Sequence, residues 1–153
     1  AYNKWDVINP KNEENYFLME KYRKLTYSEI PSYSFIPVEF ISAKEKYKIQ
    51  KLLNTALRVY EDRKYRISTS ILNEWLQKNV KESNINYPVS QLKVYYATQV
   101  ETSPPHFVFF INNKKYLKKD YEKFLENKLR LAFEFSGVPI KISFREKNKK
   151  EEE

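Results

Sequence analysis

The sequence predicts a mixed fold in two parts, an α/β part followed by an α+β part. In the first part, helical and extended apolar patterns alternate, as they do in a parallel crossover. In the second part the patterns run helix, strand, strand, helix, strand, which is typical of a three-stranded sheet with helices on one side. A short charged run, residues 63–66, separates the two patterns. We therefore predict domains at 1–64 and 65–146, followed by a disordered charged tail at 147–153.

The first part is predicted to contain two helices and one strand. A helix is expected at about residues 13–25, with its buried side formed by Phe17, Leu18, Tyr22 and Leu25. The apolar run 36–41 predicts a strand. A second amphipathic helix ends at about Asp62 and is expected to pack on the sheet. Its apolar stripe consists of Ile49, Leu52, Leu53, Ala56, Leu57, Val59 and Tyr60.

The second part begins with hydroxyl side chains, Ser68 to Ser70, that are expected to cap a helix. The apolar stripe of that helix is Ile71, Leu72, Trp75, Leu76 and Val80. A polar loop at 82–91 leads to strands at 92–98 and 107–112, whose alternation would bury Leu92, Val94 and Tyr96 and then Phe107, Phe109 and Ile111. A long helix at 119–135 follows, with Gly137 as its left-handed cap, and the last strand is expected at 140–144.

Two short motifs are predicted to recognise guanine. The first is Asn3-Lys4-Trp5-Asp6, and the second is Ser42-Ala43-Lys44, one helix and one strand later. Guanine presents an N1–H and an amine side by side, so one carboxylate, Asp6, can accept from both. Asn3 would join the two loops, the Lys4 stem would cover a ring face, and the Ala43 N–H would donate to O6. Each motif alone is also compatible with a capped turn, and it is their spacing that favours the site.

The sequence contains no loop that could hold the phosphates of a nucleotide. A phosphate loop has the pattern Gly-x-x-x-x-Gly-Lys-Ser/Thr, and the chain has one glycine, Gly137. Without that loop Mg²⁺ has no evident ligands and the γ-phosphate has no positioned water. We therefore expect this chain by itself not to hydrolyse GTP and to hold no nucleotide tightly.

The composition excludes several other classes of function. With 41% hydrophobic and 16% aromatic residues the chain should fold as a soluble protein. The absence of cysteine excludes disulfides, thiolate metal sites and cysteine nucleophiles. The single histidine, His106, is expected at the edge of a sheet and not in catalysis. No segment has the length and apolarity of a membrane span, and no signal peptide is evident, so the cytoplasm is the expected location.

Several ordered segments closely resemble the C-terminal part of the bacterial tandem GTPase family Der, also called EngA. They are residues 66–77, 95–100, 104–108, 121–127 and 137–140. The resemblance covers nearly the whole chain. It implies the end of the second P-loop GTPase domain followed by a KH-like domain, in a protein that binds GTP or GDP with Mg²⁺ and acts in assembly of the large ribosomal subunit. It also implies that Asn3, Lys4, Asp6, Ser42, Ala43 and Lys44 belong to the second nucleotide site.

Two departures accompany the resemblance. The chain starts inside the strand that carries Asn3, so we expect it to be a piece of a longer protein that contains the phosphate loop. KH domains ordinarily clamp a nucleic-acid backbone with a Gly-x-x-Gly loop, and this chain has none. Because the predicted strand 36–41 would lack a neighbour, self-association through the first part is also expected.

Basic residues are concentrated in the second part, where residues 65–145 hold 13 lysines and arginines against seven acidic residues. The candidates for RNA contact are Lys93, Tyr95, Lys114, Lys115, Lys118, Lys119, Lys141 and Arg145, with Arg63, Lys64 and Arg66 at the hinge. Two alternatives stay open. The charges can be a solvated surface, or the sheet of the second part can dock on the GTPase domains and sense their nucleotide state.

Overall fold

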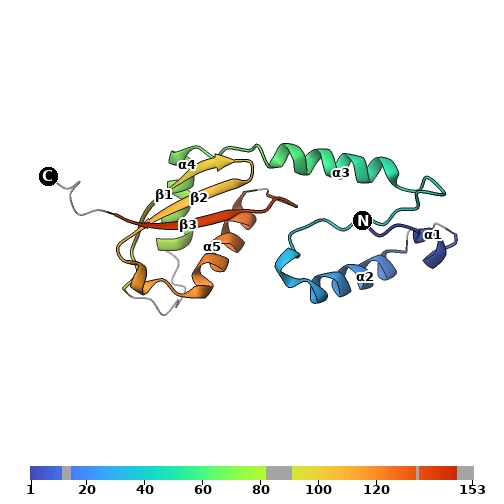
Figure 1. Ribbon diagram of the computed structural model, residues 1–153, viewed down its shortest axis with the longest axis horizontal. Helices are drawn as coiled ribbons and strands as arrows, with labels where there is room; N and C mark the ends of the chain where they lie inside the picture. Colours follow the sequence, from blue (N-terminus) through green and yellow to red (C-terminus); the bar gives the residue numbers. More distant parts are fainter. Residues whose placement is uncertain (12–14, 82–90, 134, 148–153) are drawn as a thin grey trace. The chain divides into compact units, whose positions relative to one another are not determined.

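The computed structural model describes residues 1–11, 15–81, 91–133 and 135–147. The chain divides into two compact units (Figure 1). Unit 1 consists of Ala1–Glu61 with Ser136–Val138, and unit 2 consists of Asp62–Phe135 with Pro139–Glu153. Most of the predicted loop 82–91 and of the tail 147–153 lies outside the described residues.

Unit 1 is built around an aromatic core. Its elements are α1 (Trp5–Ile8), α2 (Tyr16–Glu29), the 3-10 turn η1 (Pro31–Tyr33) and α3 (Ile49–Asp62). Trp5, Met19 and Phe40 are buried together, and the Trp5 and Phe40 rings lie 4.5 Å apart between centroids. Tyr2 pairs with Phe40 in a parallel bridge and stacks on its ring at 5.4 Å. Aromatic pairs of this kind add about 0.5–1.5 kcal/mol beyond the burial of their area.

The predictions for the strand and for the first long helix of unit 1 are corrected by the structure. The run 36–41 forms no strand, because its parallel ladder is reduced to the single bridge between Tyr2 and Phe40. The predicted stripe of α2 is half correct: Leu18 and Tyr22 pack against the core. The buried residue of the helix is Met19, however, while Phe17 is 83% exposed and Leu25 52%.

Helix α3 has the predicted bounds but does not close the unit. None of its residues is buried, and its stripe residues Leu53 and Leu57 are more than half exposed. A stripe is buried only against a sheet of sufficient width, and the predicted sheet is not formed here. Instead, α3 is held by polar contacts to Glu39, from the Thr55 hydroxyl at 2.9 Å and from Lys51 Nζ at 3.1 Å.

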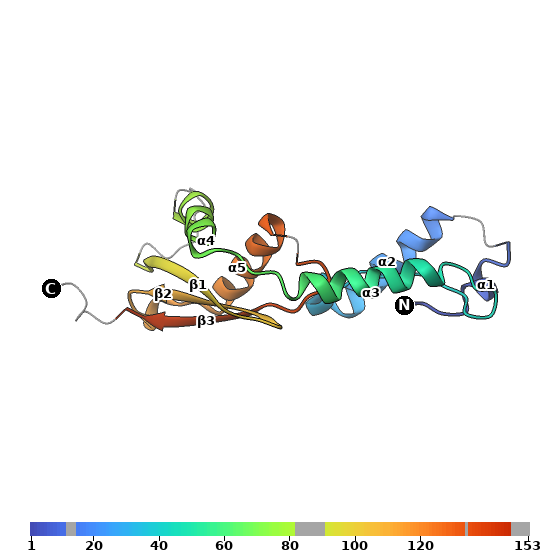
Figure 2. The ribbon, with the colours of Figure 1, turned by 90° about the horizontal axis from the view of Figure 1, so that it is seen from above.

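Unit 2 is a three-stranded sheet with two helices on one face (Figures 1 and 2). Its elements in order are α4 (Thr69–Leu76), a π-helical turn η2 (Gln77–Lys81), β1 (Val94–Thr102), β2 (Pro105–Ile111), the 3-10 turn η3 (Lys114–Tyr116), α5 (Lys119–Ala132) and β3 (Lys141–Glu146). The strand order is β1-β2-β3, with β1 antiparallel and β3 parallel to the central β2. The predicted order of helices and strands is confirmed.

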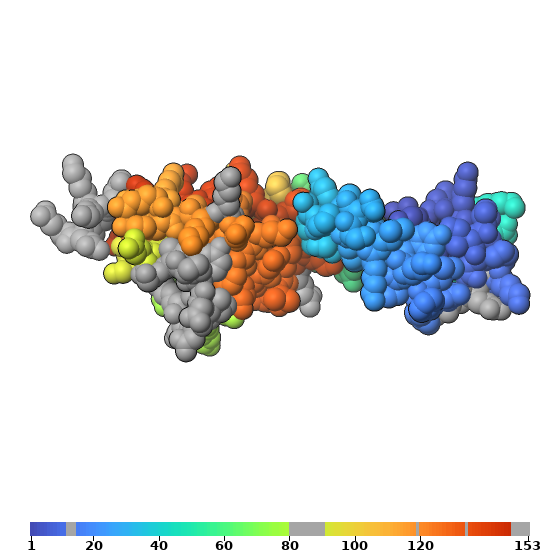
Figure 3. Space-filling model, turned by 90° about the horizontal axis from the view of Figure 1, so that it is seen from below, coloured from blue at the N-terminus to red at the C-terminus, as the bar shows by residue number. Residues whose placement is uncertain are grey.

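The helices cover the face of the sheet that carries Phe107, Phe109 and Ile111, all of which are fully buried. Helix α4 contributes Leu72, Trp75 and Leu76, and the Ser68 hydroxyl accepts a hydrogen bond from the Ile71 N–H, as predicted for the cap. Ile71, predicted in the buried stripe, is 52% exposed. The surface of α5 is seen in orange in Figure 3.

Helix α5 ends at Ala132, earlier than predicted, because Phe133 already has extended backbone angles. Gly137 is left-handed, with φ at 76°, but it lies in the loop after the helix and does not cap it. Its N–H donates to the carbonyl of Phe35 within unit 1. The left-handed conformation favours glycine at this position.

Polar side-chain bonds join β1 to the segment that leads into α4 and to α4 itself. The Asn73 side chain accepts from the Ala97 N–H at 2.8 Å and donates to the Ala97 carbonyl at 2.9 Å. Buried Gln99 accepts from the Ile67 N–H at 2.7 Å and donates to the Tyr65 carbonyl at 3.0 Å. An edge strand otherwise presents unpaired backbone groups, so the Asn73 contacts protect β1 at Ala97 from pairing with another chain.

Candidate functional site

The structure brings the two predicted guanine motifs together in unit 1. Asn3 Oδ1 accepts from the backbone N–H of Ala43 at 3.1 Å and from the N–H of Lys4 at 2.8 Å. Lys4 is left-handed, with φ at 60°, and its side chain is exposed. The Trp5 N–H donates to the carbonyl of Ile41 at 2.9 Å. Hydrogen bonds therefore join the segment 3–5, which belongs to the first motif, to the segment 41–43, which contains the start of the second.

Asp6 follows the anchor residue Trp5, which is fully buried against Phe40. The Asp6 carboxyl oxygen Oδ1 is buried and has no hydrogen-bond partner among the described residues. A buried carboxylate oxygen without a partner costs on the order of 1–3 kcal/mol, so a hydrogen bond from a donor is favourable there. Because this oxygen is shielded from solvent, a base reaches it only if the residues around Asp6 move.

The second motif lies in a closed loop. Ser42 and Tyr47 exchange two backbone hydrogen bonds, at 3.2 and 2.9 Å, and the Ser42 hydroxyl accepts from the Glu45 N–H at 3.1 Å. The turn thus formed presents Ala43 and Lys44, both exposed. One detail differs from the prediction: the Ala43 N–H, expected to meet guanine O6, donates here to Asn3 Oδ1. Lys46 and Lys48 in this loop have positive φ, 55° and 53°.

Most of the predicted RNA-contact residues lie at one end of the sheet in unit 2. Lys93 precedes β1 and is bonded through its N–H to Asn112 at the end of β2. The Lys114 N–H donates to the Glu146 carboxylate at 2.7 Å, and Lys115 lies over the ring of Tyr116. Tyr95 is 39% exposed, with Lys147 Nζ 5.5 Å from its ring centroid. Lys118, which is exposed, precedes α5; Lys119 begins it.

The two remaining candidates, Lys141 and Arg145, lie on β3 and do not form one cluster with each other. Lys141 pairs with His106 and Arg145 pairs with Phe110 in the parallel ladder, so about 13 Å of strand separates them. At the hinge, Arg63, Lys64 and Arg66 are exposed, but the Arg66 guanidinium donates to the Gln99 carbonyl at 3.2 Å. Arg66 therefore has a structural contact.

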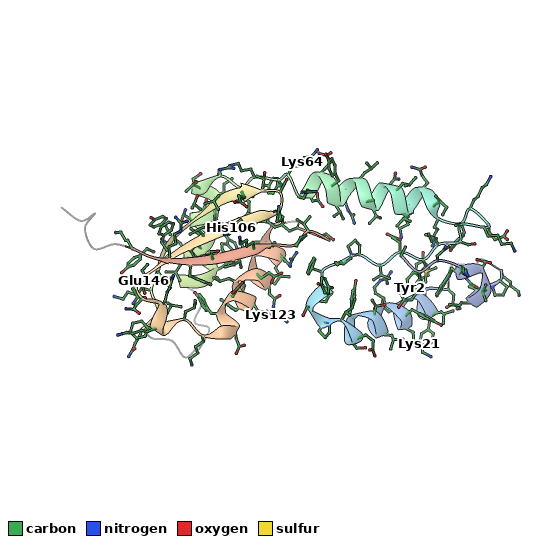
Figure 4. All side chains as sticks on the ribbon, in the orientation of Figure 1. Tyr2, Lys21, Lys64, His106, Lys123 and Glu146 are labelled. Atoms are coloured by element: carbon green, nitrogen blue, oxygen red, sulfur yellow. The ribbon has the colours of Figure 1, made fainter. Side chains whose placement is uncertain are left out.

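His106 was predicted at the edge of a sheet, but it lies on β2, which is the central strand (Figure 4). Its Nε2 lies 2.8 Å from the Ser143 hydroxyl, and its Nδ1 lies 3.9 Å from the Glu101 carboxylate. Sequence reasoning also misplaced Tyr96, which was expected in the core. A register shift between Val94 and Tyr96 puts its ring on the other face, stacked on Phe110 at 4.2 Å. The sequence held one sign of this: in β2 both alternating sets of residues are largely apolar, so apolar residues of β1 have partners on either face of the sheet.

Within the described ranges, none of the helices combines the length and apolarity needed to cross a membrane. The same residues include no group of three histidine or acidic side chains that could hold a metal ion.

Comparison with known proteins gives one family and several relatives. Residues 66–145 match the family model described as the KH-domain-like C-terminal domain of EngA bacterial GTPase enzymes. The GTPase Der of Clostridium tetani is 42% identical over 147 residues, which cover 95% of this chain and 32% of that protein. The GTPases Der of Fusobacterium nucleatum and Caldicellulosiruptor saccharolyticus are 40% and 39% identical, with 95% and 99% of this chain covered and 33% and 34% of those proteins. The chain thus spans about a third of the length of these relatives.

Proposed function

Because this chain belongs to the family of KH-domain-like C-terminal regions of EngA bacterial GTPases, we propose that it combines a guanine-recognition half-site with a module for the ribosome. Unit 1 is the C-terminal portion of a P-loop GTPase domain. In the intact parent it binds the base of GTP or GDP, with Mg²⁺ held by the phosphates and by residues outside this chain. The chain alone lacks the phosphate loop and does not hydrolyse GTP.

The observation that carries the guanine assignment is the junction of the two motifs at Asn3 and Ala43, with the unpartnered Asp6 oxygen beside Trp5. Asp6 accepts from guanine N1–H and from the amine, and Lys4 covers one ring face. Lys44 and Ser42 belong to the facing loop, in which Ser42 holds the turn. Adenine offers no matching donors to Asp6, and its binding would leave a buried carboxylate unpaired.

A titration with guanosine and adenosine, followed by amide chemical shifts, tests this assignment. Without phosphate contacts we expect millimolar affinity for guanosine, with shifts at Asn3, Asp6 and Ala43, and no saturable shifts with adenosine. Equal shifts with both nucleosides, or none with guanosine near its solubility limit, would refute the assignment. Submicromolar binding of GDP would contradict the claim that the phosphate loop is required.

For unit 2 we propose binding to the large ribosomal subunit in the cytoplasm, through ribosomal RNA or protein. The support is the family together with the surplus of basic residues in residues 65–145. The alternative is that unit 2 docks on the GTPase domains of the parent and senses their nucleotide state. Salt separates the two, because each neutralised phosphate adds about 0.9 to the slope of log affinity against log salt for duplexes and about 0.7 for single strands.

The corresponding experiment is sedimentation of isolated large subunits with the chain in a salt series. A loss of affinity by a factor of 10 or more between 50 and 200 mM salt is expected for several phosphate contacts. Affinity independent of salt would favour docking through an apolar surface. Absence of any binding to the subunit would leave the nucleotide sensor as the surviving function.

A further inference from the structure

One face of the sheet in unit 2, the face that the described helices of this unit do not cover, has the composition of a surface that a ligand covers. We call it the sheet face and define it by Tyr96, Thr98, His106, Val108, Phe110, Lys141, Ser143 and Arg145. The ladder pairs place these residues on the side opposite Phe107, Phe109 and Ile142. The described helices of unit 2 lie on that opposite side (Figures 1 and 2).

The central strand is unusual for a sheet with one solvated face. Such strands alternate apolar and polar residues. Strand β2 instead reads Pro-His-Phe-Val-Phe-Phe-Ile, so the sheet face carries Val108 and Phe110. Val108 is only 1% exposed, so the apolar residues of this face that a ligand can reach are Tyr96 and Phe110, which are half-buried. A strand that is apolar on both sides is typical of a sheet that is covered on both faces.

The centre of the sheet face is an aromatic pair. The Tyr96 and Phe110 rings lie 4.2 Å apart with planes within 13° of parallel. Arg145 is the ladder partner of Phe110 on the other side, so the guanidinium extends from a position adjacent to this pair. Arginine and aromatic rings together are the groups on which unpaired bases stack.

The polar residues around the pair also fit a nucleic acid. Arg145 and Lys141 are exposed at the two ends of β3. Between them, the Ser143 hydroxyl pairs with His106 Nε2 at 2.8 Å and keeps a lone pair that can accept from a ribose hydroxyl. The acidic residue at the defined face, Glu101, lies beside His106 at 3.9 Å, at the end that carries Lys141 and away from Arg145, so two basic side chains stand against one carboxylate. The charge of the face is therefore complementary to a polyanion.

We propose that the sheet face binds single-stranded RNA, with bases on Tyr96 and Phe110 and the backbone along Lys141 and Arg145. This proposal rests on the proposed role of unit 2 at the ribosome and names the surface that performs it. A single strand is required because the bases of a duplex are already stacked and do not expose their faces. The mode differs from the Gly-x-x-Gly clamp, for which the chain lacks the glycines.

The test compares two matched double variants of the full chain. Tyr96→Leu with Phe110→Leu removes the aromatic pair and retains apolar side chains. Tyr16→Leu with Phe17→Leu makes the same two changes on α2, where both rings are at least 70% exposed. A labelled 12-nucleotide single-stranded RNA and an RNA duplex of equal length are titrated at fixed salt, and thermal unfolding verifies that each variant folds.

We expect the sheet-face variant to lose affinity for the single strand by roughly 5- to 150-fold for each base that stacks, and the α2 variant to bind as the unaltered chain. The duplex is expected to bind more weakly than the single strand. If the sheet-face variant folds poorly, ultraviolet cross-linking of the unaltered chain to the RNA, with mass spectrometry, should place the adduct at Tyr96 or Phe110.

Unchanged RNA affinity in a folded sheet-face variant would overturn the proposal, and so would cross-links confined to residues 114–119. A change in self-association with unchanged RNA affinity would assign the face to a protein. These outcomes leave binding to the large subunit intact, whereas failure of the unaltered chain to bind either RNA or subunits would overturn the proposed role of unit 2 as well.

Discussion

Replacement of Asn73 by alanine should destabilise unit 2 more than any ordinary surface substitution. The Asn73 side chain bonds both the N–H and the carbonyl of Ala97 and also donates to the Thr69 carbonyl at 2.7 Å. Ala97 is fully buried, so Asn73→Ala leaves two backbone groups of the edge strand without partners. At about 1–3 kcal/mol for each of the two orphaned groups, and with about 0.5 kcal/mol regained from helix propensity, we expect a loss of about 1.5–5.5 kcal/mol.

That loss is a large fraction of the roughly 5–15 kcal/mol by which domains are stable. At about 4–8 °C per kcal/mol for a domain of this size, it corresponds to a decrease in Tm on the order of 6–44 °C. Urea unfolding followed by circular dichroism measures the free energy, and hydrogen exchange at the Ala97 amide reports the edge directly. Asn127→Ala is the matched control, because Asn127 is an exposed asparagine in the interior of α5.

The control should be as stable as the unaltered chain or slightly more so, since alanine favours a helix. A free energy of unfolding for Asn73→Ala within about 0.5 kcal/mol of the unaltered chain would refute the reasoning. It would mean that water replaces the asparagine at the edge of β1. Loss of protection at Ala97 with unchanged global stability would likewise show that the edge bonds do not support the sheet.

Three further outcomes follow from single residues. Asp6→Asn replaces one carboxylate oxygen by an amide NH₂, which fits the C2 carbonyl of xanthine and not the amine of guanine. Nucleoside titrations should therefore show the preference moving from guanosine to xanthosine, and a retained preference for guanosine would contradict the base contact. Lys46→Gly relieves a left-handed lysine and should raise the free energy of unfolding of unit 1 by up to about 1 kcal/mol, whereas a decrease would argue against strain there. The pKa of Glu74 is lowered, first by the hydrogen bond from Lys78 and then by the Lys78 charge. The ion pair therefore stabilises the folded chain at pH values above the ordinary pKa of a glutamate, and this contribution is lost as the pH falls through the lowered pKa. NMR titration should show this pKa rising in Lys78→Ala, and an unchanged value would exclude the pair.

Local patterns predicted the elements of unit 2 well, because each helix and strand there buries its own apolar side against the others. Ser68 and the stripe of Leu72, Trp75 and Leu76 are examples in which cap and core agree. The bulge before Tyr96 was not predicted, since a register shift arises from pairing with β2 and leaves no local signature. Asn73 was missed for the same reason: its role depends on Ala97, 24 positions later.

Unit 1 was predicted less well, because its helices were assigned to a sheet that the described residues do not form. The stripe of α3 was correct as a pattern, but burial depends on a partner surface. The approach of Asn3 to Ala43, in contrast, follows from motifs placed at the ends of adjacent parallel segments. The identity of unit 1 as part of a P-loop GTPase domain and the nucleotide contacts of its motifs stay predictions.

The central claim is that unit 2 is a specific module for the large ribosomal subunit. The most direct measurement is the affinity of this chain for isolated large subunits and for an unrelated RNA of equal length, at one near-physiological salt concentration. We expect subunits to bind at least tenfold more tightly than the competitor. Equal affinity for the two would contradict it and reduce unit 2 to a basic surface without specificity.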